Sequence, residues 1–179
     1  MKVVVVGVSA GGPETLKKIF QNVKVLRVPV VVAQHNTTED VEGFANWLST
    51  QIKWEIQVVK NRDIISPSTI YIPAGGKDIV LLGKDVVAAK EPAGIVAPSI
   101  DRLFKSAAKF LKNNAVAIVL SGLGKDGVEG AKEIESTGGR VIVQQDAKFS
   151  HLPELVAEEV ARSSKRSWID IAMFIENLR

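Results

Sequence analysis

Residues 3–12 read VVVVGVSAGG, and they introduce a pattern that the rest of the chain repeats. The run 3–6 is continuous and β-branched, as in strands covered on both faces of a parallel sheet. Pro13 and Glu14 follow, and both residue types are favoured in the first turn of a helix. The opening therefore predicts a strand, a tight glycine-rich turn and a helix.

The alternation continues along the chain. Further strands are expected at 28–33, 55–60, 69–76, 115–122 and 140–145. Helices are expected at 41–52, where Thr37 or Thr38 is the expected cap, and at 99–111, 128–137, 153–160 and 169–178. The stretch 79–89, IVLLGKDVVAA, predicts an antiparallel hairpin. The fold class is therefore α/β, a doubly wound, mostly parallel sheet with helices on both faces and an antiparallel hairpin.

Composition limits the classes of function. The chain of 179 residues is 46% hydrophobic and 24% charged, which predicts a single globular domain over 1–179. A net charge of +3 favours anionic partners only weakly, and the densest basic cluster, 162–166, lacks interleaved aromatic residues, so no nucleic acid partner is expected. The absence of cysteine excludes disulfides and thiol nucleophiles. No apolar run approaches the roughly 18 residues that suggest a membrane span, so we expect a cytoplasmic protein without membrane insertion.

Three polar loops are expected at the carboxyl ends of parallel strands, where ligand sites of open α/β sheets lie. They are GVSAGG with Ser9, QHNTTE with His35 and SGLGKDG with Asp126. A serine hydroxyl needs an imidazole to take its proton, and the imidazole needs a carboxylate to fix its tautomer. Glycines around the serine would let backbone amides face a developing oxyanion. The three loops together indicate a Ser-His-Asp catalytic triad.

Each residue also has a simpler interpretation. Ser9 could be a turn residue, His35 a surface or capping residue, and Asp126 a residue favoured by a helix N-terminus. His151, at an expected helix start, is the fallback base. Lys77, Asp78, Ser99 and Asp101 border the same expected face, where turn or cap chemistry and substrate contact are both open.

Dinucleotide binding is the competing interpretation of the opening. Gly7, Ser9 and Gly12 match the GxGxxG spacing, but Ser9 replaces the middle glycine whose missing side chain lets a pyrophosphate approach. His35 stands where a ribose-binding acid is expected after the second strand. With no cysteine and two distant histidines, no metal and no cofactor are expected.

Five segments together carry a family resemblance. GVSAGGPETL, QHNTTEDVEGFANWL, YIPAGGKDIVLL, APSIDRLFKSAA and VLSGLGKDGVEGAKEI, in this order, resemble the catalytic domain of the chemotaxis protein-glutamate methylesterases, the CheB family. The resemblance implies a doubly wound sheet with an antiparallel hairpin. It also implies hydrolysis of glutamyl methyl esters on the helical cytoplasmic region of chemoreceptors with release of methanol, and in some members deamidation of receptor glutamines.

The resemblance places the catalytic residues on Ser9, His35 and Asp126. It places the oxyanion-binding backbone on Leu123 and on the turn at Ala10. Leu123 stands where the family has methionine, and Ala10 where many members have threonine, so backbone roles survive while any help from a threonine hydroxyl is lost.

The family's regulatory receiver domain is not expected in this chain, because Met1 lies directly before the first strand. A receiver domain would be a partner if the chain were excised from a longer protein. Two other hypotheses stay open at this point. One is a noncatalytic module that binds a nucleotide or an acidic helix, and the other is an esterase or amidase with a different small substrate.

Overall fold

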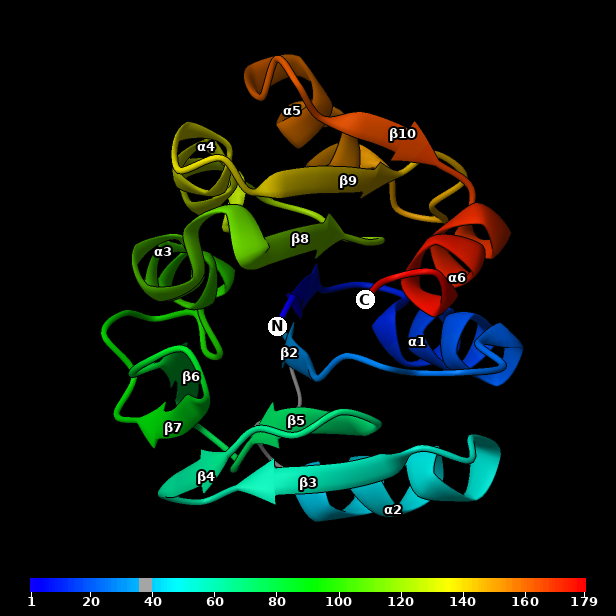
Figure 1. Ribbon diagram of the computed structural model, residues 1–179, viewed down its shortest axis with the longest axis vertical. Coiled ribbons are helices and arrows are strands. Elements are labelled where there is room, and N and C mark those ends of the chain that lie inside the picture. Colours follow the sequence, from blue (N-terminus) through cyan, green and yellow to red (C-terminus); the bar gives the residue numbers. More distant parts are fainter. Residues whose placement is uncertain (36–39) are drawn as a thin grey trace.

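A seven-stranded, wholly parallel sheet forms the centre of the computed structural model, which describes residues 1–35 and 40–179 (Figure 1). Its strand order is β10-β9-β8-β1-β2-β5-β3. The bounds are β1 (Val3–Val8), β2 (Val30–Gln34), β3 (Glu55–Val59), β5 (Thr69–Pro73), β8 (Ala115–Val119), β9 (Arg140–Gln144) and β10 (Ser164–Arg166). The doubly wound parallel sheet predicted from the sequence is confirmed.

Helices cover both faces of this sheet (Figure 1). One face carries α1 (Gly12–Asn22), α2 (Val41–Gln51) and α6 (Trp168–Glu176), and the other carries α3 (Ile100–Leu111), α4 (Val128–Ser136) and α5 (His151–Glu159). Alternate residues of a strand point to opposite faces, so the valine run supplies both cores: Val3 and Val5 pack with α3, and Val4 and Val6 pack with α1. This burial on both faces explains why β1 needs a continuous apolar run.

A second, antiparallel sheet lies beside the main one. It has the order β4-β7-β6, with β4 (Arg62–Ile64), β6 (Asp78–Leu81) and β7 (Val86–Lys90). The hairpin predicted at 79–89 forms β6 and β7, so that expectation is confirmed. The sequence did not predict β4 or β10, because both are three residues long and largely polar.

The helix starts show which residues act as caps. Ser99 caps α3 by accepting a hydrogen bond from the Arg102 N–H, as expected. The carboxylate of Asp40 caps α2 by accepting from the Gly43 N–H, and the predicted caps Thr37 and Thr38 lie outside the described residues. None of the helices in the described ranges is long and apolar enough to cross a membrane.

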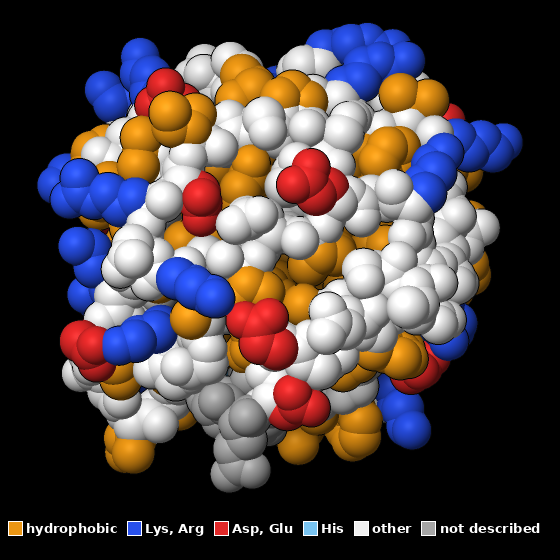
Figure 2. All heavy atoms as spheres, turned by 90° about the horizontal axis from the view of Figure 1, so that it is seen from below, with side chains coloured by type: hydrophobic (Ala, Val, Ile, Leu, Met, Phe, Trp, Pro, Cys, Tyr) orange, Lys and Arg blue, Asp and Glu red, His pale blue; other side chains and the backbone are white. Residues whose placement is uncertain are grey.

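On the face shown in Figure 2, Lys and Arg side chains lie scattered, mostly toward the rim, and do not gather into one continuous basic patch. That face therefore lacks the electrostatic footprint typical of a nucleic-acid interface.

Strand register determines which loops meet at the carboxyl edge. Val8 of β1 pairs with Gln34 of β2, so the next residue of each strand, Ser9 and His35, are neighbours across the pair. On the other side, the Ser9 N–H donates to the carbonyl of Ser121, which follows β8. The loops that hold Ser9, His35 and Asp126 therefore surround the carboxyl ends of the central strands.

Candidate active site

The turn after β1 holds Ser9 in a fixed backbone position. The Ser9 N–H donates to the carbonyl of Ser121 over 3.0 Å, and the Ser9 carbonyl accepts from the Gly12 N–H over 3.0 Å. Gly11 has a φ of 78°, a left-handed conformation that glycine adopts without strain. A Cβ on Gly122 would lie 3.0 Å from the Ser9 Cβ, so the second glycine-rich loop packs directly behind the serine.

Gln34 connects the serine turn to the histidine loop. Its side-chain amide donates to the carbonyls of Ser9 and His35, over 3.0 and 2.8 Å. Only 4% of Gln34 is exposed. Gly12 leaves room for this amide, since a Cβ there would lie 1.7 Å from Gln34 Oε1. This role of Gln34 was not predicted from the sequence, where the one signal is a lone polar side chain that ends the apolar run VVVAQ.

Ser121 holds the same turn from the β8 side. It is fully buried, and its hydroxyl donates to the Ala10 carbonyl over 2.7 Å and accepts from the Phe149 N–H over 3.1 Å. From the sequence, Ser121 was expected only as part of a glycine-rich loop. Its role depends on contacts 111 and 28 residues distant in sequence, which no local pattern reveals.

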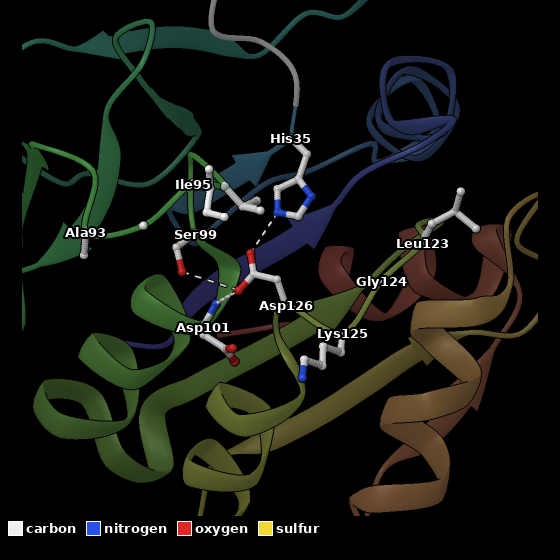
Figure 3. Close-up of a pocket in the computed structure, with 11 residues that line it drawn as sticks. His35, Ala93, Ile95, Ser99, Asp101, Leu123, Gly124, Lys125 and Asp126 are labelled. Atoms are coloured by element: carbon white, nitrogen blue, oxygen red, sulfur yellow. Dashed lines mark hydrogen bonds and ion pairs between the residues drawn. The ribbon is translucent and has the colours of Figure 1, made fainter.

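His35 and Asp126 form a direct pair (Figure 3). His35 Nε2 lies 2.8 Å from Asp126 Oδ2, and the two side chains are 10% and 19% exposed. An ionised carboxylate only accepts hydrogen bonds, so Nε2 must carry the proton in this contact. The other ring nitrogen, Nδ1, is then left as the basic one.

The amino end of α3 binds the Asp126 carboxylate. The Ile100 N–H donates to Oδ2 over 2.7 Å and the Asp101 N–H donates to Oδ1 over 2.9 Å. Burial by itself would raise the pKa of Asp126, but the hydrogen bond from His35 and these two amides outweigh it, so the pKa lies below its ordinary value of 3.8. Asp126 is therefore a stable anion at neutral pH.

Ser99 and Asp101 lie at this same helix end. The Ser99 hydroxyl is 3.4 Å from Asp126 Oδ1 and also caps α3, so its hydrogen bonds are made within the protein. Asp101 Oδ1 accepts from the Gly130 N–H over 2.7 Å. Burial and the nearby charge of Asp126 raise the pKa of Asp101 despite that amide.

The ion pair of Asp78 and Arg102 supports the loop that precedes α3. Asp78 is fully buried, and it accepts from the N–H groups of Ser99 and Ala93 over 2.7 and 3.3 Å. Arg102 Nη1 donates to Asp78 Oδ2 and to the Glu91 carbonyl, each over 2.7 Å. These contacts fix both ends of the loop 91–98.

A cleft of about 560 Å³ opens in front of the His35–Asp126 pair (Figure 3). Its wall combines polar and exposed apolar side chains: His35, Ala93, Gly94, Ile95, Val96, Ser99, Asp101, Leu123, Gly124, Lys125 and Asp126. Ile95, Val96 and Leu123 are 105%, 48% and 53% exposed, so a partner that enters the cleft meets an apolar rim. The loop 93–96 was not predicted from the sequence as part of the site.

Three other predicted site residues, Ser9, Lys77 and His151, do not line this cleft. Half-buried Ser9 does not line it, and within the described ranges the Ser9 hydroxyl has no hydrogen-bond partner. Lys77 also lies outside the lining and pairs with Glu91 at the base of the loop 91–98. His151 begins α5 and is exposed. No three His, Cys, Asp or Glu side chains of the described chain form a metal-binding group.

Comparison with known proteins agrees with this architecture. The model of the CheB methylesterase family matches residues 4–175. The crystal structure of the Thermotoga maritima CheB methylesterase catalytic domain superimposes with a TM-score of 0.92 at 27% identity, covering 99% of this chain and 98% of that one.

Curated relatives extend beyond this chain. A protein-glutamate methylesterase/protein-glutamine glutaminase from Trichodesmium erythraeum is 34% identical over 82% of this chain and 44% of its own length. One from Methanospirillum hungatei is 29% identical over 99% of this chain and 52% of its own length. The chain thus spans about half the length of these relatives.

The sheet, with its polar site at the carboxyl ends of the strands, defines a doubly wound α/β domain of the kind seen in the Thermotoga catalytic domain. The chain belongs to the CheB methylesterase family.

Proposed function

We propose that this domain is a serine esterase that hydrolyses glutamyl methyl esters on the cytoplasmic helices of chemoreceptors. The observation that carries the proposal is the pair of His35 and Asp126, 2.8 Å apart, at the strand end where Ser9 is the neighbour of His35 in register. The names of the relatives supply the substrate class.

The first half of the reaction forms an acyl-enzyme. Ser9 Oγ attacks the ester carbonyl carbon while Nδ1 of His35 takes the hydroxyl proton, since Nε2 is engaged with Asp126. Asp126 stabilises the resulting imidazolium without taking its proton. When the tetrahedral intermediate collapses, the bond to the methoxy oxygen breaks, His35 returns the proton, and methanol leaves.

The second half releases glutamate. A water molecule attacks the acyl carbon and gives its proton to His35, which then protonates Ser9 Oγ as the acyl bond breaks. A glutamine side chain can follow the same path, with ammonia in place of methanol. This common chemistry suits relatives that are named both methylesterase and glutaminase.

Two backbone amides are suitable donors for the oxyanion. The N–H groups of Ala10 and Leu123 donate to no acceptor within the described part of the chain. Both belong to loops that flank Ser9, because the Ser9 N–H bonds to Ser121 and Gly122 packs on the Ser9 Cβ. Hydrogen bonds from such fixed donors become stronger as negative charge develops on the substrate oxygen in the transition state.

The cleft supplies the surface for the helical substrate. Its apolar rim suits the side of a helix, while Lys125 can face acidic residues near the ester. Ser99 and Asp101 shape its floor and hold the Asp126 loop, so contact with substrate is secondary to that role. Lys77, paired with Glu91, would contribute only at the margin.

The decisive experiment compares methanol release from methylated receptor fragments by the wild-type domain and by the Ser9→Ala variant. The matched control is Ser49→Ala, at an exposed serine of α2. We expect release by the wild type and by Ser49→Ala and none by Ser9→Ala. Equal release by all three would disprove the serine mechanism, and release of ammonia alone from glutamine-bearing fragments would make the domain a glutaminase.

A further inference from the structure

The far edge of the main sheet places arginines on one face. Ser164 of β10 pairs with Ile142 of β9, and Arg166 pairs with Gln144. Paired residues of neighbouring strands point to the same face of the sheet, and so do residues two apart in one strand. Ile142 belongs to the core under α6. Arg140, two residues before Ile142, therefore projects from the same face as Ser164 and Arg166.

These residues line a pocket of about 300 Å³. The pocket lies at β10, the edge strand of the main sheet (Figure 1). Its walls are Gly138, Gly139, Arg140, Val141, Ile142, Arg162, Ser164, Arg166 and Phe174. It shares no lining residue with the cleft at His35. Arg140 begins β9, at the opposite end of the strand from the candidate active site.

The charges of this pocket are not balanced by the protein. Within the described ranges, the guanidinium groups of Arg140 and Arg166 have no hydrogen-bond acceptor and no ion-pair partner. Arg166 Nε is buried and unsatisfied while its guanidinium lies over the Phe174 ring, 4.9 Å from the centroid. Arg162 alone is paired, with Glu135 at 3.9 Å.

A buried donor without an acceptor is unfavourable, and an ionised acceptor would satisfy it most strongly. Three arginines against the single carboxylate of Glu135 leave an excess of two positive charges. A phosphate dianion neutralises that excess, whereas one carboxylate neutralises only half of it. The planar guanidinium fork and the Ser164 hydroxyl also suit a tetrahedral oxyanion.

We propose that this edge pocket binds a phosphate dianion, either as free phosphate or as a phosphate monoester. Arg140 and Arg166 would donate paired hydrogen bonds to it from one face of the sheet, with Ser164 between them. Arg162 would close the rim.

The test is calorimetric titration at constant ionic strength with inorganic phosphate, phenyl phosphate and acetate as separate probes. Arg140→Ala removes an exposed guanidinium that makes no hydrogen bond or ion pair within the described residues, so folding should persist. Arg166→Lys keeps the charge but removes the fork. Arg62→Ala, at an exposed arginine of β4 in the small sheet, is the matched control.

We expect phosphate or its monoester to bind more tightly than acetate. Arg140→Ala and Arg166→Lys should each weaken binding about 10-fold, the scale for a lost charge-assisted hydrogen bond, and Arg62→Ala less than about 2-fold. Preference for phenyl phosphate would identify a phosphorylated ligand, and preference for inorganic phosphate a free anion. The proposal would be overturned if both pocket variants bound phosphate as tightly as the wild type. It would also be overturned if Arg62→Ala weakened binding as much as the pocket variants did, or if acetate bound as tightly as phosphate.

Discussion

Asp126 Oδ2 lies 2.8 Å from Nε2 of His35, and the same carboxylate accepts hydrogen bonds from the first two amides of α3. One carboxylate therefore connects the candidate base to a helix N-terminus. The positive end of the helix dipole and the two N–H groups stabilise the anion before any substrate arrives. The anion in turn fixes the proton of His35 on Nε2. The orientation of the histidine thus depends on the packing of α3 as well as on Asp126.

The Asp126→Asn variant should lose most of its esterase activity. An amide in this position can offer an N–H toward His35 and favour the wrong tautomer, so we expect kcat to fall on the order of 10⁴-fold. Methanol release measured with methylated receptor fragments would report this. Asp85→Asn, at an exposed aspartate of the hairpin turn, serves as the control. A loss below about 10-fold would show that Asp126 does not orient the base.

Acid should remove the stabilisation that Asp126 provides. Its folded-state pKa is depressed below 3.8, so the ionised carboxylate stabilises the fold above that value and the effect is lost as the pH falls through the depressed pKa. The difference in unfolding free energy between wild type and Asp126→Asn should therefore be largest near neutrality and shrink below about pH 4. Urea unfolding at both ends of this range measures it. A difference that stays constant with pH would contradict the assignment.

Asp101 should show the opposite dependence. Burial first, and then repulsion by Asp126, raise its folded-state pKa, so its ionised form destabilises the fold and the penalty grows as pH rises through that raised pKa. Asp101→Asn keeps an acceptor for the Gly130 N–H, so we expect a more stable protein at pH 7 and no gain at pH 3. Urea unfolding of the two proteins at these pH values decides it, and a loss of stability at pH 7 would refute it.

The sequence predicted the sheet because buried strands and amphipathic helices leave periodic patterns. It also placed Ser9, His35 and Asp126 at strand ends, which the sheet brings to one edge. The pairing register of β1 and β2 makes Ser9 and His35 neighbours. That register depends on which valine of β1 pairs with which residue of β2. That pairing is a tertiary property that periodicity alone does not specify.

The contacts that support the site escaped prediction for a related reason. Arg102 and Asp78 are 24 residues apart, and Gln34 is a single polar residue at the end of an apolar strand. Neither has a local spacing rule comparable to a helix face or a turn motif. Short polar edge strands such as β10 likewise resemble loops until a neighbouring strand pairs with them.

Gln34 should act as a positioning residue between the serine and histidine loops. We expect Gln34→Ala to lower kcat about 30-fold, as loss of two hydrogen bonds worth about 1 kcal/mol each would imply, while KM changes little. Gly12→Ala should produce a similar defect, because its Cβ would displace the Gln34 amide.

The double variant Gly12→Ala/Gln34→Ala gives the sharper measurement. Removing the amide also removes the clash, so its kcat should match that of Gln34→Ala alone. Gly83→Ala, whose Cβ would meet only Asp85 Oδ1 at 3.9 Å, is the matched glycine control and should retain activity. Simple multiplication of the two single losses would rule out action through Gln34.

The ion pair of Asp78 and Arg102 should stabilise both the fold and the site. Arg102→Ala leaves the fully buried Asp78 without its cation, and breaking buried pairs costs about 3–5 kcal/mol. Because the Arg102 side chain is 36% exposed, we expect a smaller loss of about 2–3 kcal/mol in urea unfolding. Arg102→Lys, which keeps the charge, should recover part of it.

Activity distinguishes local positioning from general destabilisation in these variants. Asp78 accepts hydrogen bonds from the N–H of Ser99, the cap of α3, and from the side chain of Arg102, in the first turn of α3. The same turn donates to the Asp126 carboxylate. At a temperature where Arg102→Ala is fully folded, its kcat should still be several-fold below that of the wild type. The kcat of Arg102→Lys should stay near the wild-type value, because lysine, unlike alanine, can neutralise Asp78. Equal kcat in the wild type, Arg102→Ala and Arg102→Lys would mean that the ion pair contributes to stability alone. The loop 91–98 would then have no influence on the orientation of His35.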